Sequence, residues 1–150
     1  MNEYSRFGAA FALLNRSAHA YFASRLAPFG IRPAHQGYLL VILPNEEINQ
    51  ERIANRHQVD KANAARAVAL LEQLGYVSRR KDPMDRRNWL VSLTETGMEV
   101  RAAVESMMRE WVEVLSNSVD AGTWRTMLTG VESMARAAAE YASDPGPDRS

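Results

Sequence analysis

The 150-residue sequence predicts a mainly α-helical protein that contains one β-hairpin near the middle of the chain. Apolar residues recur at helical spacing over long segments at both ends of the chain. Two shorter helical segments lie just before the hairpin, and each follows a residue of a type that caps helices. The hairpin is predicted from two strand-like runs, 76–81 and 88–93, on either side of a turn that contains Pro83. This order of elements is that of a winged helix-turn-helix with a second, helical lobe.

The first predicted helix covers residues 4–27 and ends at Pro28-Phe29-Gly30. A helix of this length, with aromatic residues along one stripe, has more apolar surface than a small lobe could cover. We therefore expect it to pack against a partner chain. The stripe consists of Phe7, Phe11, Leu14, Ala18, Tyr21, Phe22 and Leu26.

Three helices with recognisable starts are predicted before the hairpin. One begins near Pro33, a favoured first-turn residue, and a short linker at 45–48 follows it. Asn49 and Asp60 are the expected N-caps of the next two helices, and Gly75 ends the second of these. The predicted ranges are 33–44, 50–57 and 61–74.

Two long helices are predicted after the hairpin. Thr94 caps the first, which covers residues 95 to about 116, and the second covers about 121 to 141. Residues 142–150 are expected to form a mobile tail. The outer helices make up the second structural lobe.

The composition excludes several classes of protein. The chain has no cysteine, which rules out disulfides and thiol redox chemistry and fits a cytoplasmic location. No apolar run approaches the ~20 residues that a membrane span requires. The N-terminus lacks the apolar core of a signal peptide.

The charges are unevenly distributed although the net charge is zero. Residues 51–90 contain nine Lys or Arg and five Asp or Glu, which gives this stretch +4 and the rest of the chain −4. A basic middle between acidic ends suggests a surface that binds a polyanion. On charge alone, an ordinary solvated surface explains the pattern equally well.

The helix over 61–74 has the pattern expected of a DNA-recognition helix. Its buried stripe is predicted to be Ala64, Ala67, Val68, Leu71 and Leu74. This leaves Lys61, Asn63, Arg66 and Gln73 off that stripe. Asn63 could pair with adenine, and Arg66 with guanine or with phosphate. The alternative is that these are surface polar residues of an amphipathic helix.

The turn of the hairpin carries two arginines beside an aspartate. Asp85 could accept a hydrogen bond from a nearby arginine and fix the shape of the turn. Arg87 would then project into the minor groove of DNA, where the negative potential favours a guanidinium, and Arg86 would contact phosphate. The alternative is a solvated hairpin without such a role.

One further pattern combines the helix over 61–74 with the hairpin. It consists of Asp60, Arg66, Leu71-Glu72, Gly75-Tyr76-Val77 and Arg79, then Asp82-Pro83-Met84-Asp85-Arg86-Arg87, Val91, Leu93-Thr94 and Gly97. With these residues the chain resembles the MarR/SlyA family of winged helix-turn-helix transcriptional regulators, over essentially its whole length. Three positions depart from the family pattern: Met84 stands where many members carry a basic residue, and Ala64 and Ala65 stand where Thr or Ser is common.

The resemblance implies a homodimer that binds double-stranded DNA. Helices within 4–31 and 95–141 would interlock between two chains, and two winged lobes, residues 33–93, would read the half-sites of a pseudo-palindrome. Members mostly repress nearby genes, and many release DNA when a small phenolic or anionic molecule binds. The candidate DNA-binding residues are Lys61, Asn63, Arg66, Arg79, Asp85, Arg86 and Arg87.

Four residues are candidates for effector binding: Arg16, His19, Tyr38 and Trp111. An arginine with aromatic neighbours suits an aromatic carboxylate. The alternative is that the rings belong to the dimer core.

No metal site, cofactor or catalytic centre is predicted. The three histidines lie far apart in the sequence, and there is no cysteine to complete a zinc site. No glycine-rich phosphate loop and no nucleophile elbow is present. The rival to a DNA-binding regulator is therefore a winged-helix module that binds another protein, although such a module has no need of arginines at the tip of its hairpin.

Overall fold

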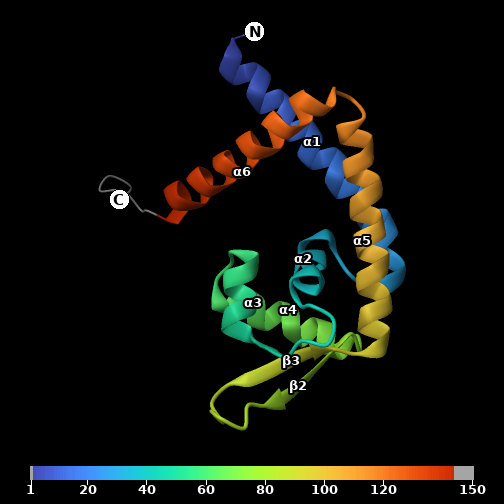
Figure 1. Cartoon of the computed structure of the whole chain (residues 1–150), viewed down its shortest axis with the longest axis vertical. Coiled ribbons are helices and arrows are strands. Elements are labelled where there is room, and N and C mark those ends of the chain that lie inside the picture. Colours follow the sequence, from blue (N-terminus) through green and yellow to red (C-terminus); the bar gives the residue numbers. More distant parts are fainter. Residues whose placement is uncertain (1, 144–150) are drawn as a thin grey trace. The chain divides into compact units, whose positions relative to one another are not determined.

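The computed structural model describes residues 2–143, and Figure 1 shows the order of their helices and strands. The chain divides into two compact units, Met1–Arg109 and Glu110–Ser150, so the boundary lies within one long helix. The elements are α1 (Glu3–Leu26), a 3-10 turn η1 (Ala27–Phe29), α2 (Pro33–Val41), β1 (Ile48–Asn49), α3 (Gln50–His57), α4 (Lys61–Gln73), β2 (Val77–Lys81), β3 (Trp89–Leu93), α5 (Glu95–Ser116) and α6 (Ala121–Ser143).

The predicted helix starts before and after the hairpin are confirmed by their caps. The Oδ1 atom of Asn49 accepts a hydrogen bond from Arg52 N at 2.8 Å, and that of Asp60 accepts one from Asn63 N at 2.8 Å. Thr94 Oγ1 accepts from Gly97 N at 3.0 Å at the start of α5. Each cap satisfies a backbone N–H that has no partner inside its own helix.

The sheet has three strands, one more than the sequence predicted. Its order is β1-β3-β2, and all pairs are antiparallel. Ile48 pairs with Val91 in β3, within the stretch that the sequence analysis assigned to a linker. A two-residue strand is too short to show an alternating pattern, but its position buries the Ile48 side chain completely.

Two predicted boundaries also need correction. The helix expected over 33–44 ends at Val41, because Ile42 adopts an extended conformation that buries its side chain. The tail was predicted to start at residue 142, but residues 142 and 143 belong to α6, which continues to Ser143. Residues 144–150, the remainder of that tail, lie outside the described residues.

The core of the first unit lies beneath α4 and the sheet. Of the stripe predicted for α4, Ala64, Ala67, Val68 and Leu71 are buried and Leu74 is half-buried. Burial of this face turns the opposite face of α4 toward solvent. Fully buried side chains come from eight elements and the loop after α2; the largest are Leu26, Leu39, Ile42, Ile48, Ile53, Leu71, Val68, Val77, Val91 and Val104.

Two glycines permit close packing around this core. A Cβ atom at Gly97 in α5 would lie 1.8 Å from the carbonyl oxygen of Tyr76, at the start of the hairpin. A Cβ atom at Gly37 in α2 would lie 2.1 Å from Cε1 of His57, whose ring packs edge-on against Tyr38 with centroids 4.4 Å apart. These glycines allow α5 to reach the hairpin and α3 to reach α2.

Arg101 ties α5 to the end of α2. Its Nε donates to the carbonyl oxygen of Ile42 at 3.1 Å, and its Nη2 donates to that of Leu40 at 3.3 Å. These are carbonyls at the C-terminal end of a helix, where cations are favoured. The first half of α5 is thereby fixed to the winged lobe.

Candidate nucleic-acid interface

The N-terminal half of α4 carries a chain of three hydrogen-bonded polar side chains. Asp60 caps the helix through Oδ1, and its Oδ2 accepts a hydrogen bond from Nδ2 of Asn63. The Oδ1 atom of Asn63 in turn accepts from Nη2 of Arg66. The hydrogen bond from the Asn63 backbone, followed by that from its side chain, holds the pKa of Asp60 below its usual range, so this carboxylate stays charged at neutral pH.

Lys61 and Arg66 are the two cations on the exposed side of α4. Lys61 Nζ lies 2.8 Å from a carboxylate oxygen of Glu51 in α3, but both side chains remain largely exposed. Exposed pairs of this kind contribute little to stability and separate readily. Lys61 is therefore able to exchange Glu51 for another anion.

The turn between β2 and β3 is shaped by Asp85. Its Oδ1 accepts from the backbone N–H and from Nε of Arg87, both at 3.1 Å, and its Oδ2 accepts from Asn88 Nδ2 at 3.3 Å. The hydrogen bonds from Arg87 lower the pKa of Asp85. The hydrogen bond expected of Asp85 is thus present, and its partner is Arg87 itself.

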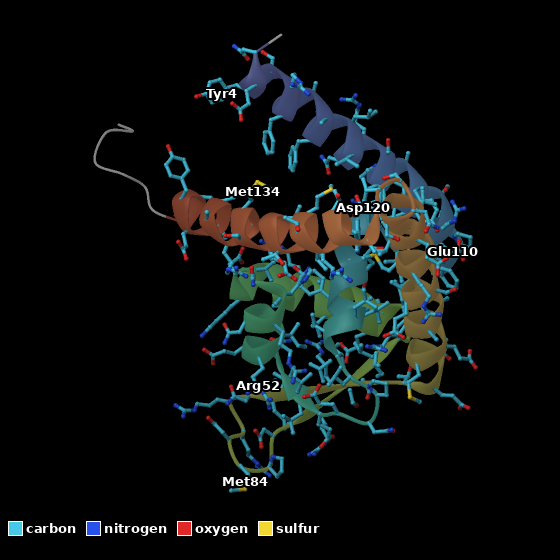
Figure 2. The ribbon with its side chains drawn as sticks, turned by 45° about the horizontal axis from the view of Figure 1, so that its top comes forward. Tyr4, Arg52, Met84, Glu110, Asp120 and Met134 are labelled. Atoms are coloured by element: carbon cyan, nitrogen blue, oxygen red, sulfur yellow. The ribbon has the colours of Figure 1, made fainter. Side chains whose placement is uncertain are left out.

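The tip of this hairpin is strongly exposed. The side chain of Arg87 is 90% exposed even with its contact to Asp85, and Arg86 is exposed beside it. Figure 2 shows Met84 at the turn, where it is also fully in solvent. Asp82 Oδ1 accepts from Met84 N at 2.8 Å and stabilises the other side of the turn.

The base of the hairpin holds its cations much more tightly. Arg79 Nε donates to Glu72 Oε2 at 2.7 Å, and its guanidinium carbon lies 5.5 Å from the ring centroid of Trp89. Arg80 forms a two-pronged ion pair with Glu47. Sequence reasoning missed these partners of Arg79. Two signals for them were available. One is the spacing of Glu72 and Arg79 across the Gly75 turn, and the other is the strand register that brings Arg79 near Trp89.

Fewer cations of residues 51–90 are available to bind an external anion than the net charge of this stretch implies. Of its nine cations, Arg56, Lys61, Arg79 and Arg80 each form an ion pair with an acidic side chain of another element. Glu46 and Glu47, which pair with two of them, precede the stretch whose charges were counted. The exposed cations that remain on α4 and the hairpin turn are Arg66, Arg86 and Arg87.

The four residues predicted for effector binding do not share one cavity among the described residues. Tyr38 is buried, and it lines a hollow of about 370 Å³ between the start of α2 and α4. His19 lines a second hollow of about 360 Å³ between α1 and the start of α2. Arg16 lines neither, and Trp111 belongs to the second unit. Arg32, which the sequence analysis did not select, lines both hollows.

Within residues 2–143, no group of three or more His, Asp or Glu side chains is arranged to hold a metal ion. None of the helices in that range combines the length and apolar character that a membrane crossing needs.

Comparison with known proteins points to one family of regulators. A family model described as "MarR family" matches residues 29–88. A crystal structure of a MarR transcriptional regulator from Methanosarcina mazei Go1 is 30% identical, with a TM-score of 0.75, over 91% of this chain and 99% of that one. The HTH-type transcriptional regulator BilQ of Clostridioides difficile (strain CD3) is 26% identical over 98 residues, or 65% of this chain and 66% of that protein.

A solved complex with DNA shares the fold. It is a MarR mutant from E. coli bound to operator DNA, with a TM-score of 0.74 and 22% identity over 89% of this chain and 96% of that one. The chain spans about half to two thirds of the length of the curated relatives it matches.

Proposed function

The chain belongs to the MarR family of transcriptional regulators, a family of regulators and not of enzymes, and from this premise we propose that it is a homodimeric DNA-binding repressor that a small aromatic or anionic molecule releases from its operator. It would act in the cytoplasm, on double-stranded DNA.

The observation that carries this proposal is the exposure of cations at two separate places on the winged lobe. Arg66 lies on the solvent face of α4, and Arg86 and Arg87 lie at the tip of the hairpin. A helix fits the major groove, and an arginine on a projecting hairpin suits the negative potential of a narrow minor groove. A relative of the same fold was solved in complex with operator DNA, which supports this use of the lobe.

The salt dependence of binding tests this proposal. If a dimer neutralises about 6–10 phosphates, its affinity for DNA should fall about 10³–10⁵-fold between about 50 and 200 mM salt, because bound counterions are released. Fluorescence anisotropy with labelled duplexes at several salt concentrations measures the slope. Binding that does not respond to salt, or no binding at all, favours the rival proposal of a winged-helix module that binds another protein.

The apolar residues of α1 support the homodimer. Phe7 and Phe11 stack with ring centroids 6.2 Å apart, and they are 58% and 62% exposed. Tyr4 and Leu14 extend this stripe, and Figure 2 labels Tyr4 near its end. A second copy of the chain would bury these side chains in a symmetric interface.

Light scattering at micromolar concentration measures this association directly. We expect twice the mass of the 16.8 kDa chain. Replacing both Phe7 and Phe11 by Asp should yield monomers, whereas Arg86→Ala, a surface change far along the chain, should leave the dimer intact. A wild-type mass of one chain would exclude the homodimer.

The effector is proposed to bind near the start of α2, where Tyr38 and His19 line neighbouring hollows. Arg32 lines both and could pair with a carboxylate, while Tyr38 offers an aromatic surface. Screening aromatic acids by the melting temperature and by release of labelled DNA tests this proposal. Arg32→Ala should abolish both responses. Arg16→Ala tests separately whether Arg16, which the sequence predicted for effector binding but which lines neither hollow, contributes to them.

Repression itself is tested by transcription from a promoter that overlaps a selected operator. The protein should lower transcript yield, and an active effector should restore it. An increase on adding the protein would make it an activator.

A further inference from the structure

The chain of side chains on α4 fixes the orientation of the Asn63 amide. A carboxylate can only accept hydrogen bonds and a guanidinium can only donate them. Because Asp60 lies on one side of Asn63 and Arg66 on the other, the amide nitrogen must face Asp60 and the amide oxygen must face Arg66. This arrangement is the one observed, and both bonds are charge-assisted.

Asn63 and Arg66 differ in the capacity that remains for DNA. Asn63 uses one of its two N–H donors on Asp60 and one of its two oxygen lone pairs on Arg66. These bonds fix the plane of the amide, so turning its remaining donor and acceptor to face an adenine would compete with two charge-assisted bonds. Arg66 has five N–H donors and uses one of them on Asn63. It can present two others to the O6 and N7 atoms of guanine while the chain stays intact.

Because Asn63 already holds Arg66 before DNA binds, binding costs less side-chain conformational entropy. A free arginine side chain loses much rotamer freedom when it docks on a base. An arginine whose guanidinium already rests on Asn63 loses less of it, so more of the contact energy appears as affinity.

We propose that Arg66 reads a guanine in each half-site and that Asn63, held by Asp60, is a positioning residue for Arg66 and reads no base of its own. This inference rests on the proposed DNA-binding function. It revises the prediction from the sequence that Asn63 pairs with adenine.

The test compares base preferences among variants on one operator. The operator is first selected from random duplexes by the wild-type protein, and each base pair of a half-site is then replaced in turn. Arg66→Ala should flatten the preference at one G·C pair by roughly 5- to 150-fold. Asn63→Ala should flatten the preference at that same pair and at no other, and the double variant should be no worse than Arg66→Ala alone.

Two further variants separate positioning from folding. Asp60→Ser keeps a good N-cap but removes the oxygen that holds Asn63 Nδ2, so it should weaken the preference at the same pair while the helix stays intact. Gln73→Ala changes an exposed residue in the last turn of α4 and should leave every preference unchanged. Thermal melting of each variant reports on the fold.

Each contrary result has a distinct meaning. If Asn63→Ala flattens a different base pair from Arg66→Ala, or if the two losses add, Asn63 reads its own base and the inference is wrong. If Arg66→Ala weakens all duplexes alike, Arg66 contacts phosphate and the inference is also wrong. If the wild-type protein selects no sequence and its binding ignores salt, the proposed function itself has failed.

Discussion

The base and the tip of the hairpin both carry arginines, but they hold them differently. At the base, Arg79 is fixed between Glu72 of α4 and the ring of Trp89 in β3. At the tip, the hydrogen bonds of Arg87 to Asp85 stay within one turn, and the side chain remains 90% exposed. A count of positive charges therefore does not identify a DNA-binding surface, because some of those charges connect elements of the fold.

The largest expected effect concerns the close contact between Gly97 in α5 and the Tyr76 carbonyl at the base of the hairpin. Gly97→Ala should destabilise the protein by about 3 kcal/mol, because the added methyl group would overlap the Tyr76 carbonyl and a backbone atom cannot swing aside. Chemical denaturation measures the loss. Gly75→Ala is the control: it has open space and strains only a positive φ of 78°, so it should cost about 1 kcal/mol. Equal losses would mean that the close approach is relaxed in solution.

A smaller effect, on binding alone, is expected at the tip. Arg87→Ala should weaken operator binding by about 1–3 kcal/mol per half-site and relax the preference at flanking A/T positions. Its melting temperature should match that of the wild type because the side chain is exposed. Unchanged operator affinity would remove Arg87 from the interface.

The neighbouring arginine offers a contrast at the same tip. Arg86→Ala should weaken binding to operator and scrambled DNA alike and reduce the salt slope by about one per site. Titrations of both duplexes at several salt concentrations measure this. A loss confined to the operator would show that Arg86 reads sequence.

The smallest effect is expected from Arg79. Arg79→Ala should lower stability by about 1 kcal/mol through loss of the partly exposed ion pair and the contact with Trp89. DNA affinity measured well below the melting temperature should hardly change. The reverse outcome, lost affinity with unchanged stability, would support the prediction from the sequence that Arg79 binds DNA.

The features that could be predicted from the sequence are those with local causes. Asn49, Asp60 and Thr94 cap helices through hydrogen bonds to residues three positions later, so the pattern is visible in the chain itself. The strand at Ile48 was missed because it exists only through its pairing with β3. The fold therefore followed from short-range chemistry except where a partner lay far along the chain.

The candidate site was predictable in its residue types but not in its connections. Asp85 was correctly expected to accept a hydrogen bond from a nearby arginine, and the structure identifies that arginine as Arg87, two positions along the same turn. The hydrogen bond between Arg66 and Asn63 depends on side-chain rotamers. The hydrogen bond between Arg79 and Glu72 depends on how the hairpin packs against α4. The positions of the effector candidates also depend on the folded structure, because Tyr38 and His19 line different hollows.

The contact between Gly37 and His57 has a consequence for how this sequence can drift during evolution. A side chain at position 37 would occupy the place of the imidazole ring, 2.1 Å from its Cε1 atom. Unlike the obstacle at Gly97, this one is a side chain, so a second substitution can remove it. Among homologues, we expect alanine or serine at the position of Gly37 to occur together with a residue smaller than histidine at the position of His57, and the two positions to covary.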